Sequence, residues 1–129
     1  MLIIVWLFFI ATGNFWIYPD KISQGWDYSL AYLPYFELRK MAIQYLNKEK
    51  IEINKVYSFF PNTSIFDEVD LNEDYRKFKR YEKGANYVLY SNVNNISDKI
   101  YDDLISEYSL LKEFKSSTLF IRLYEIKTK

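Results

Sequence analysis

Residues 87–126 carry the pattern that decides the fold: YVLYSNVNNISDKIYDDLISEYSLLKEFKSSTLFIRLYEI. The stretch opens with a short β-prone run at 87–90, which predicts a buried strand. Ser97 is a natural N-cap for a helix, and Ile96 and Tyr101 occupy the positions of a hydrophobic staple. Apolar residues then recur at helical spacing, so a strand followed by a helix is predicted.

Two further strands are predicted at the end of this stretch. Residues 110–114 and 119–126 are apolar and β-prone, and the polar link at 115–117 joins them as a hairpin. The second of these strands alternates two sets of residues, Leu119, Ile121 and Leu123 against Phe120, Arg122 and Tyr124. This period-2 alternation predicts a sheet that is covered on only one face.

The preceding segment adds one helix and one strand. Apolar residues within 38–46 recur at helical spacing, and Pro34 suits the first turn of that helix. Residues 56–60 are β-prone and are followed by Pro61, which predicts a short buried strand. Residues 62–84 are mainly polar, which predicts a long crossover between two strands.

The predicted order is helix, strand, long crossover, strand, helix and a terminal strand hairpin. A strand-helix-strand unit implies a parallel pair with a right-handed crossover, and the hairpin adds an antiparallel edge. The sequence therefore predicts an α/β fold, with a small mixed sheet of about four strands and two main helices. An N-terminal apolar helix of the membrane type precedes this fold.

Composition excludes several kinds of chemistry. The chain has 129 residues, 17 Lys and Arg against 17 Asp and Glu, and neither Cys nor His. Without these side chains there is no disulfide, no thiolate or Ser-His catalysis and no Cys or His metal ligand. The balanced charge provides no field for binding nucleic acid. No cofactor is expected.

Residues 1–19 are free of charge and largely apolar. A signal peptide would need a basic start and a small-residue cleavage site. A complete transmembrane helix would need about 20 apolar residues. A helix of a globular protein would need a polar face. The end of a membrane span, truncated at its start, fits best, with Trp16 and Tyr18 at the membrane interface. The predicted domains are this helix (1–19) and a soluble extracytoplasmic α/β domain (20–129).

Two candidate sites have simpler explanations. The turn at 60–64 follows a strand but lacks the glycines of a phosphate-binding loop. The acidic residues within 67–74 lack the spacing of a calcium loop, and the basic residues within 76–83 neutralise them. We therefore expect a capped turn and a solvated surface segment, and no metal site.

A third candidate is the cluster of Gln24, Trp26, Asp27 and Tyr35. Aromatic faces combined with carboxylate or amide groups are typical of carbohydrate sites. In a small hydrolase, Asp20 and Asp27 could nominally act as paired carboxylates. The simpler alternative is that Asp27 caps a turn while Trp26 anchors the domain at the bilayer surface.

Several segments resemble one group of membrane enzymes. They are YPDKISQGWDYSLAYLPYFELR at 18–39, FFPN at 59–62, YVLYSNV at 87–93 and YSLLKEF at 108–114. Together they resemble the C-terminal part of bacterial polytopic glycosyltransferases that use polyprenyl-phosphate-linked sugars, of the protein O-mannosyltransferase and aminoarabinose-transferase type. In such proteins a last transmembrane helix enters a small extracytoplasmic domain.

The resemblance implies a domain that is not catalytic by itself, because the catalytic acid of those enzymes lies in an early loop that has no counterpart here. It implies a place on the periplasmic side of a bacterial inner membrane. The expected partners are the membrane, the membrane core of a glycosyltransferase, and a glycan or polyprenyl-phosphate sugar, with contacts from Gln24, Trp26, Asp27 and Tyr35. The alternative is an independent membrane-anchored interaction module without sugar chemistry.

Overall fold

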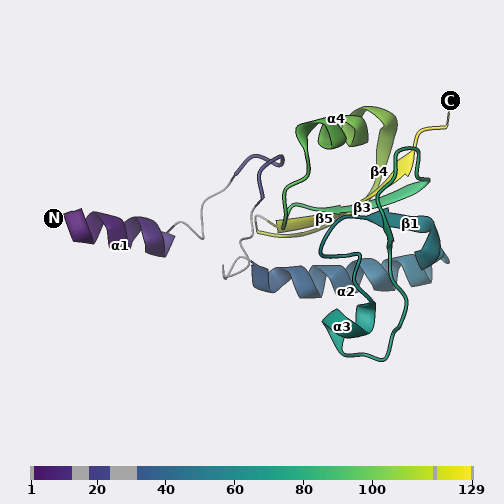
Figure 1. The fold of residues 1–129 in the computed structure, drawn as a ribbon, viewed down its shortest axis with the longest axis horizontal. Coiled ribbons are helices and arrows are strands. Elements are labelled where there is room, and N and C mark those ends of the chain that lie inside the picture. Colours follow the sequence, from purple (N-terminus) through teal and green to yellow (C-terminus); the bar gives the residue numbers. More distant parts are fainter. Residues whose placement is uncertain (1, 13–17, 24–31, 118, 129) are drawn as a thin grey trace.

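The computed structural model describes residues 2–12, 18–23, 32–117 and 119–128 (Figure 1). Within these residues the predicted mixed α/β fold is confirmed. In chain order the elements are α1 (Leu2–Thr12), α2 (Leu33–Lys48), the 3-10 helix η3 (Ile53–Lys55), β1 (Val56–Ser58), α3 (Phe66–Asp70), β2 (Lys79–Arg80), β3 (Tyr87–Ser91), α4 (Asp98–Glu107), β4 (Tyr108–Ser116) and β5 (Leu119–Ile126).

The strands of the described residues form one mixed sheet of five, one more than the four predicted, in the order β2-β1-β3-β5-β4. β1 is parallel to β2 and β3, whereas β5 is antiparallel to β3 and β4. A parallel pair around α4 was predicted, but β3 and β4 are not neighbours, because β5 folds back between them. β5 is mostly buried and β4 mostly exposed, so the more apolar strand takes the inner position.

Helices cover both faces of the sheet, with α2 on one side and α4 on the other (Figure 1). Leu119, Ile121 and Leu123 face the α2 side, while Phe120 and Tyr124 belong to the core on the α4 side. The prediction of a sheet covered on one face was therefore wrong. Phe120 and Tyr124 are large enough to form a second apolar layer beneath the amphipathic helix α4.

The two main helices begin where the sequence predicts. Pro34 lies in the first turn of α2, where its missing N–H removes no helical hydrogen bond. Ser97 caps α4, and its Oγ accepts a hydrogen bond from the Ile100 N–H at 3.4 Å. Ile96 and Tyr101, the predicted staple residues, both pack against the core on this face.

The polar segment at 62–84 contains two elements that the sequence pattern did not indicate, α3 and β2. Phe66 and Phe78 anchor it in the core, with ring centroids 4.9 Å apart. The fully buried Arg39 of α2 pairs with Asp70 at the end of α3, and its guanidinium carbon lies 4.8 Å from the centre of the Phe66 ring. Phe66 and Phe78 stand among charged residues in the sequence, so the sequence pattern did not indicate that they are buried.

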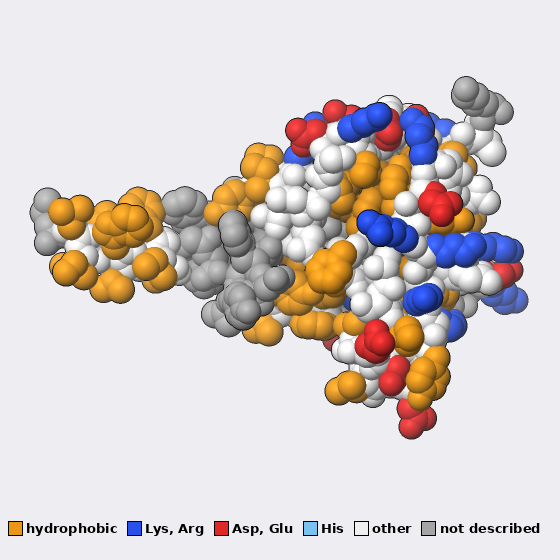
Figure 2. All heavy atoms as spheres, viewed as in Figure 1, with side chains coloured by type: hydrophobic (Ala, Val, Ile, Leu, Met, Phe, Trp, Pro, Cys, Tyr) orange, Lys and Arg blue, Asp and Glu red, His pale blue; other side chains and the backbone are white. Residues whose placement is uncertain are grey.

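α1 lies apart from the α/β body, and its apolar side chains are all exposed (Figures 1 and 2). It has 11 residues. In the part of the chain that the structure describes, no helix combines the length and apolar character needed to cross a membrane. The membrane helix at 1–19 therefore stays a prediction.

Candidate functional site

A cleft of about 1050 Å³ lies beside the carboxyl end of β1 and the segment that follows β3. This is the edge where open α/β sheets bind ligands, because the chain leaves each parallel strand there and the loops leave space between them. The cleft's described lining residues are Tyr18, Ile22, Ser23, Ser58, Phe59, Phe60, Thr63, Arg80, Tyr81, Asn94, Asn95, Ile96 and Ile100.

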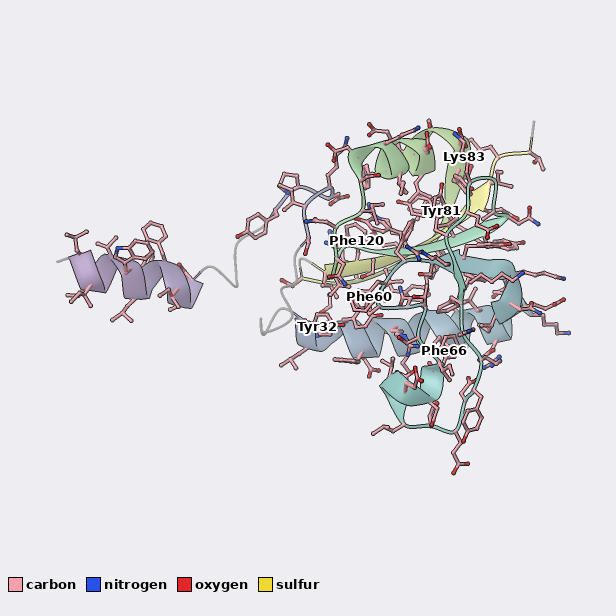
Figure 3. All side chains as sticks on the ribbon, in the orientation of Figure 1. Tyr32, Phe60, Phe66, Tyr81, Lys83 and Phe120 are labelled. Carbon is pink, nitrogen blue, oxygen red and sulfur yellow. The ribbon has the colours of Figure 1, made fainter. Side chains whose placement is uncertain are left out.

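One wall of the cleft is aromatic. Phe59 follows β1 and stacks on Tyr81, which follows β2, with ring centroids 4.8 Å apart and an interplanar angle of 29°. Phe60 is 68% exposed although it is a large apolar residue. Both Phe60 and Tyr81 can be followed in Figure 3. This wall offers flat apolar surface to a ligand.

The polar part of the cleft is nearly uncharged. Arg80, the last residue of β2, is the only charged side chain among the described lining residues. The Asn94 Nδ2 is buried and has no hydrogen-bond partner among the described residues. Ser58, by contrast, is engaged in the fold, because its Oγ donates to the Leu89 carbonyl at 2.5 Å.

Residues 18–23, which we call the strap, line the same cleft and are fastened to it at Ser23. The Ser23 N–H donates to Asn95 Oδ1 at 2.6 Å, and the Ser23 Oγ donates to the Val93 carbonyl at 2.9 Å. These partners lie in the loop between β3 and α4. The strap therefore closes one side of the cleft.

Two ion pairs also hold the strap against the α/β body, at Asp20 and Lys21. Asp20 pairs with Arg122 of β5 at 2.8 Å, and Lys21 pairs with Asp102 of α4 at 2.7 Å. The hydrogen bond to Asp102 raises the pKa of Lys21. The hydroxyl of Tyr90 donates to the Asp20 carbonyl at 3.4 Å. Side chains from two strands and one helix thus position the chain that leads toward α1.

Buried tyrosines make stability depend on alkaline pH. Burial raises the pKa of Tyr90, and also that of Tyr35, above the ordinary value of 10.0. Above that pH the unfolded chain loses these protons first, so the free energy of unfolding falls by about 1.4 kcal/mol per pH unit for each tyrosine. In the variant Tyr90→Phe, the free energy of unfolding should fall less steeply with pH, by about 1.4 kcal/mol per pH unit. Urea unfolding from about pH 9 to about pH 11.5 measures this slope. An unchanged slope would contradict the prediction.

The predicted site residues fall in different places. Tyr35 lies in the core on α2, fully buried, and its hydroxyl donates to Asn62 Oδ1 at 2.5 Å. Tyr18 is half-buried and lines the cleft. Gln24, Trp26, Asp27 and Trp16 lie outside the described residues. The predicted contact of Tyr35 with a substrate or partner stays a prediction. Within the fold, the partner of its hydroxyl is Asn62.

Sequence reasoning missed Arg80 and Asn94. Arg80 stands in a basic stretch that directly follows an acidic one, so the sequence pattern predicted that its charge is neutralised locally. Asn94 could have been found from its position in the sequence, because it closely follows a strand that was correctly predicted. Polar residues that follow parallel strands gather at one edge of the sheet. Across the described residues no three Asp or Glu side chains come together as a metal site.

The comparisons with known proteins add no relative: no protein-family model, curated protein or solved structure matches this chain. The class that fold and site define is a small mixed α/β domain with a cleft at the carboxyl edge of its parallel strands.

Proposed function

We propose that this protein is a membrane-anchored, non-catalytic α/β domain of a polyprenyl-phosphate-sugar-dependent glycosyltransferase, as a part or a stand-alone relative of it. It packs on the membrane core of that enzyme or positions the glycan donor or acceptor. The observation that carries the proposal is the strap, which lines the cleft and also leads toward α1. A ligand held in the membrane would reach the cleft from that side.

The character of α1 supports membrane anchoring. All its large apolar side chains are exposed, from Val5 at 46% to Leu2 at 76%. A helix that lies on a membrane surface needs a polar face, whereas α1 has apolar residues at every position except Thr12. The face of α1 seen in Figure 2 is apolar. Its 11 residues rise about 16 Å, which is about half the thickness of the hydrocarbon core of a bilayer.

The composition of the cleft supports binding without catalysis. The lining residues that are described include no carboxylate, and the sequence has no His or Cys. His, Cys and paired carboxylates are the groups that most often act as general acid, general base or activated nucleophile. Aromatic rings with amide and hydroxyl groups suit recognition of a sugar.

The experiment uses the full chain, isotope-labelled at isoleucine methyl groups, in lipid nanodiscs. A polyprenyl-phosphate hexose in the disc should shift the signals of Ile22, Ile96 and Ile100, which line the cleft. Ile53 and Ile121, buried on the α2 side, should stay unchanged and serve as internal references.

Phe60→Ala should weaken this binding about fivefold, because it removes exposed aromatic surface from the cleft. Tyr75→Ala is the matched control, since Tyr75 is 73% exposed and does not line the cleft. If the chain binds the membrane but the polyprenyl-phosphate hexose shifts none of the three isoleucine signals, the result favours the alternative function, an independent membrane-anchored interaction module. Transfer or hydrolysis of the sugar by the chain alone would contradict the non-catalytic assignment.

A further inference from the structure

We infer that the cleft binds the phosphate of an anionic bilayer phospholipid, with Arg80 as the charged contact. The inference rests on the membrane placement in the proposed function and adds a second kind of ligand. It concerns an ordinary lipid of the bilayer surface, which would hold the α/β body against the membrane independently of α1.

Arg80 is available for an anion, unlike Arg76 and Lys83 of the same segment. Arg76 pairs with Asp74 at 2.7 Å, whereas Arg80 is exposed and makes no ion pair among the described residues. Lys83 pairs with Asp103 and Glu107 across to α4. The Arg80 guanidinium therefore leaves the cleft with one uncompensated positive charge.

Neutral groups of the cleft complement an anionic oxygen. Asn94 Nδ2 is a buried donor that lacks a partner within the described structure, and a phosphate oxygen would satisfy it. Thr63 adds a hydroxyl to the lining. Because the described lining residues include no Asp or Glu, nothing there repels a phosphate. Arginine binds phosphate through charge-assisted hydrogen bonds.

The apolar rim indicates a lipid rather than a small soluble phosphate. Ile22 is 46% exposed and Phe60 is 68% exposed beside the same cleft. Exposed apolar side chains around a charged centre match a ligand with acyl chains next to its phosphate.

The test titrates dihexanoylphosphatidylglycerol into the isoleucine-labelled full chain, held in phosphatidylcholine nanodiscs. The lipid should give saturable shifts at Ile22, Ile96 and Ile100. Arg80→Gln should weaken the apparent affinity about tenfold or more, as expected for losing a charge-assisted contact. Lys79→Gln is the matched control: Lys79 neighbours Arg80 but lies over the Tyr57 ring, at 5.5 Å, outside the cleft.

Two further ligands separate the possible sources of the phosphate. Dihexanoylphosphatidylcholine has the same acyl chains without net charge, and glycerol 3-phosphate has the phosphate without acyl chains. If either of these ligands binds as tightly as dihexanoylphosphatidylglycerol, the inference is overturned. It is also overturned if Arg80→Gln binds dihexanoylphosphatidylglycerol as tightly as the natural chain while the Ile53 and Ile121 signals show that the variant is folded. If the polyprenyl-phosphate hexose binds but phosphatidylglycerol does not, the inference fails while the proposed function stands.

Discussion

Replacing Asp70 by Asn is expected to lower the free energy of unfolding by about 3 kcal/mol. Asp70 is the carboxylate partner of Arg39, whose side chain is fully buried. Removing one member of a buried ion pair leaves the other charge uncompensated, which costs about 3–5 kcal/mol. Because Asp70 is 17% exposed, the lower end of that range applies.

The surroundings of Arg39 offer little compensation for that loss. Its Nε and Nη2 are buried and have no hydrogen-bond partner among the described residues. The Phe66 ring face and the Tyr35 hydroxyl are also near Arg39, but both are neutral groups and neither replaces the charge of Asp70. Urea unfolding of the full chain in detergent micelles, followed by near-ultraviolet circular dichroism of its tyrosines, measures the effect.

Asp74→Asn is the matched control for this prediction. Its partner Arg76 is half-exposed, so solvent screens the pair and the expected loss is about 1 kcal/mol or less. Replacing the buried pair together, as Arg39→Met with Asp70→Leu, should restore stability to within about 1 kcal/mol of the natural chain. Equal losses for Asp70→Asn and Asp74→Asn would show that the burial of Arg39 has no energetic consequence.

Leu7→Arg is expected to reduce binding of the full chain to lipid vesicles about a hundredfold. Leu7 lies near the middle of α1 and is 60% exposed, so the substitution leaves the α/β core intact. A cation at the centre of a membrane-inserted helix costs about 2.5–3.5 kcal/mol. Flotation of the chain with vesicles on a density gradient measures the fraction bound.

Leu71→Arg separates the effect on α1 from a general effect of added charge. Leu71 is 87% exposed after α3, on the α/β body, and the variant should float like the natural chain. If Leu7→Arg floats equally well, α1 does not enter the hydrocarbon, and the membrane part of the proposed function is wrong.

The elements with strong local signals were predictable. Ser97 and the apolar spacing after it define α4 within the chain itself, and Pro34 with the apolar residues of 38–46 does so for α2. β1, β3, β4 and β5 lie where β-prone runs end at polar or proline-containing turns. These features depend on interactions between residues close in sequence.

The candidate site was not predictable in the same way. Arg80 and Asn94 line the same cleft only because β1, β2 and β3 run in parallel and end at one edge. The short β2 has only two residues, too few for any periodicity. Its strand pairing is decided by β1, since Arg80 lies opposite Ser58 in the register.

What the sequence alone determined is α2, α4, β1, β3, β4 and β5, and the lack of Cys and His chemistry, because these follow from residue type and local spacing. Only the tertiary structure decided the strand order, the double-sided core and the uncompensated charge of Arg80. The physical reason is that neighbours in space select these outcomes. β5 is inserted between β3 and β4 to bury its apolar side chains on both faces, and the acids Asp70 and Asp74, which precede Arg80 in the chain, pair with Arg39 and Arg76 instead.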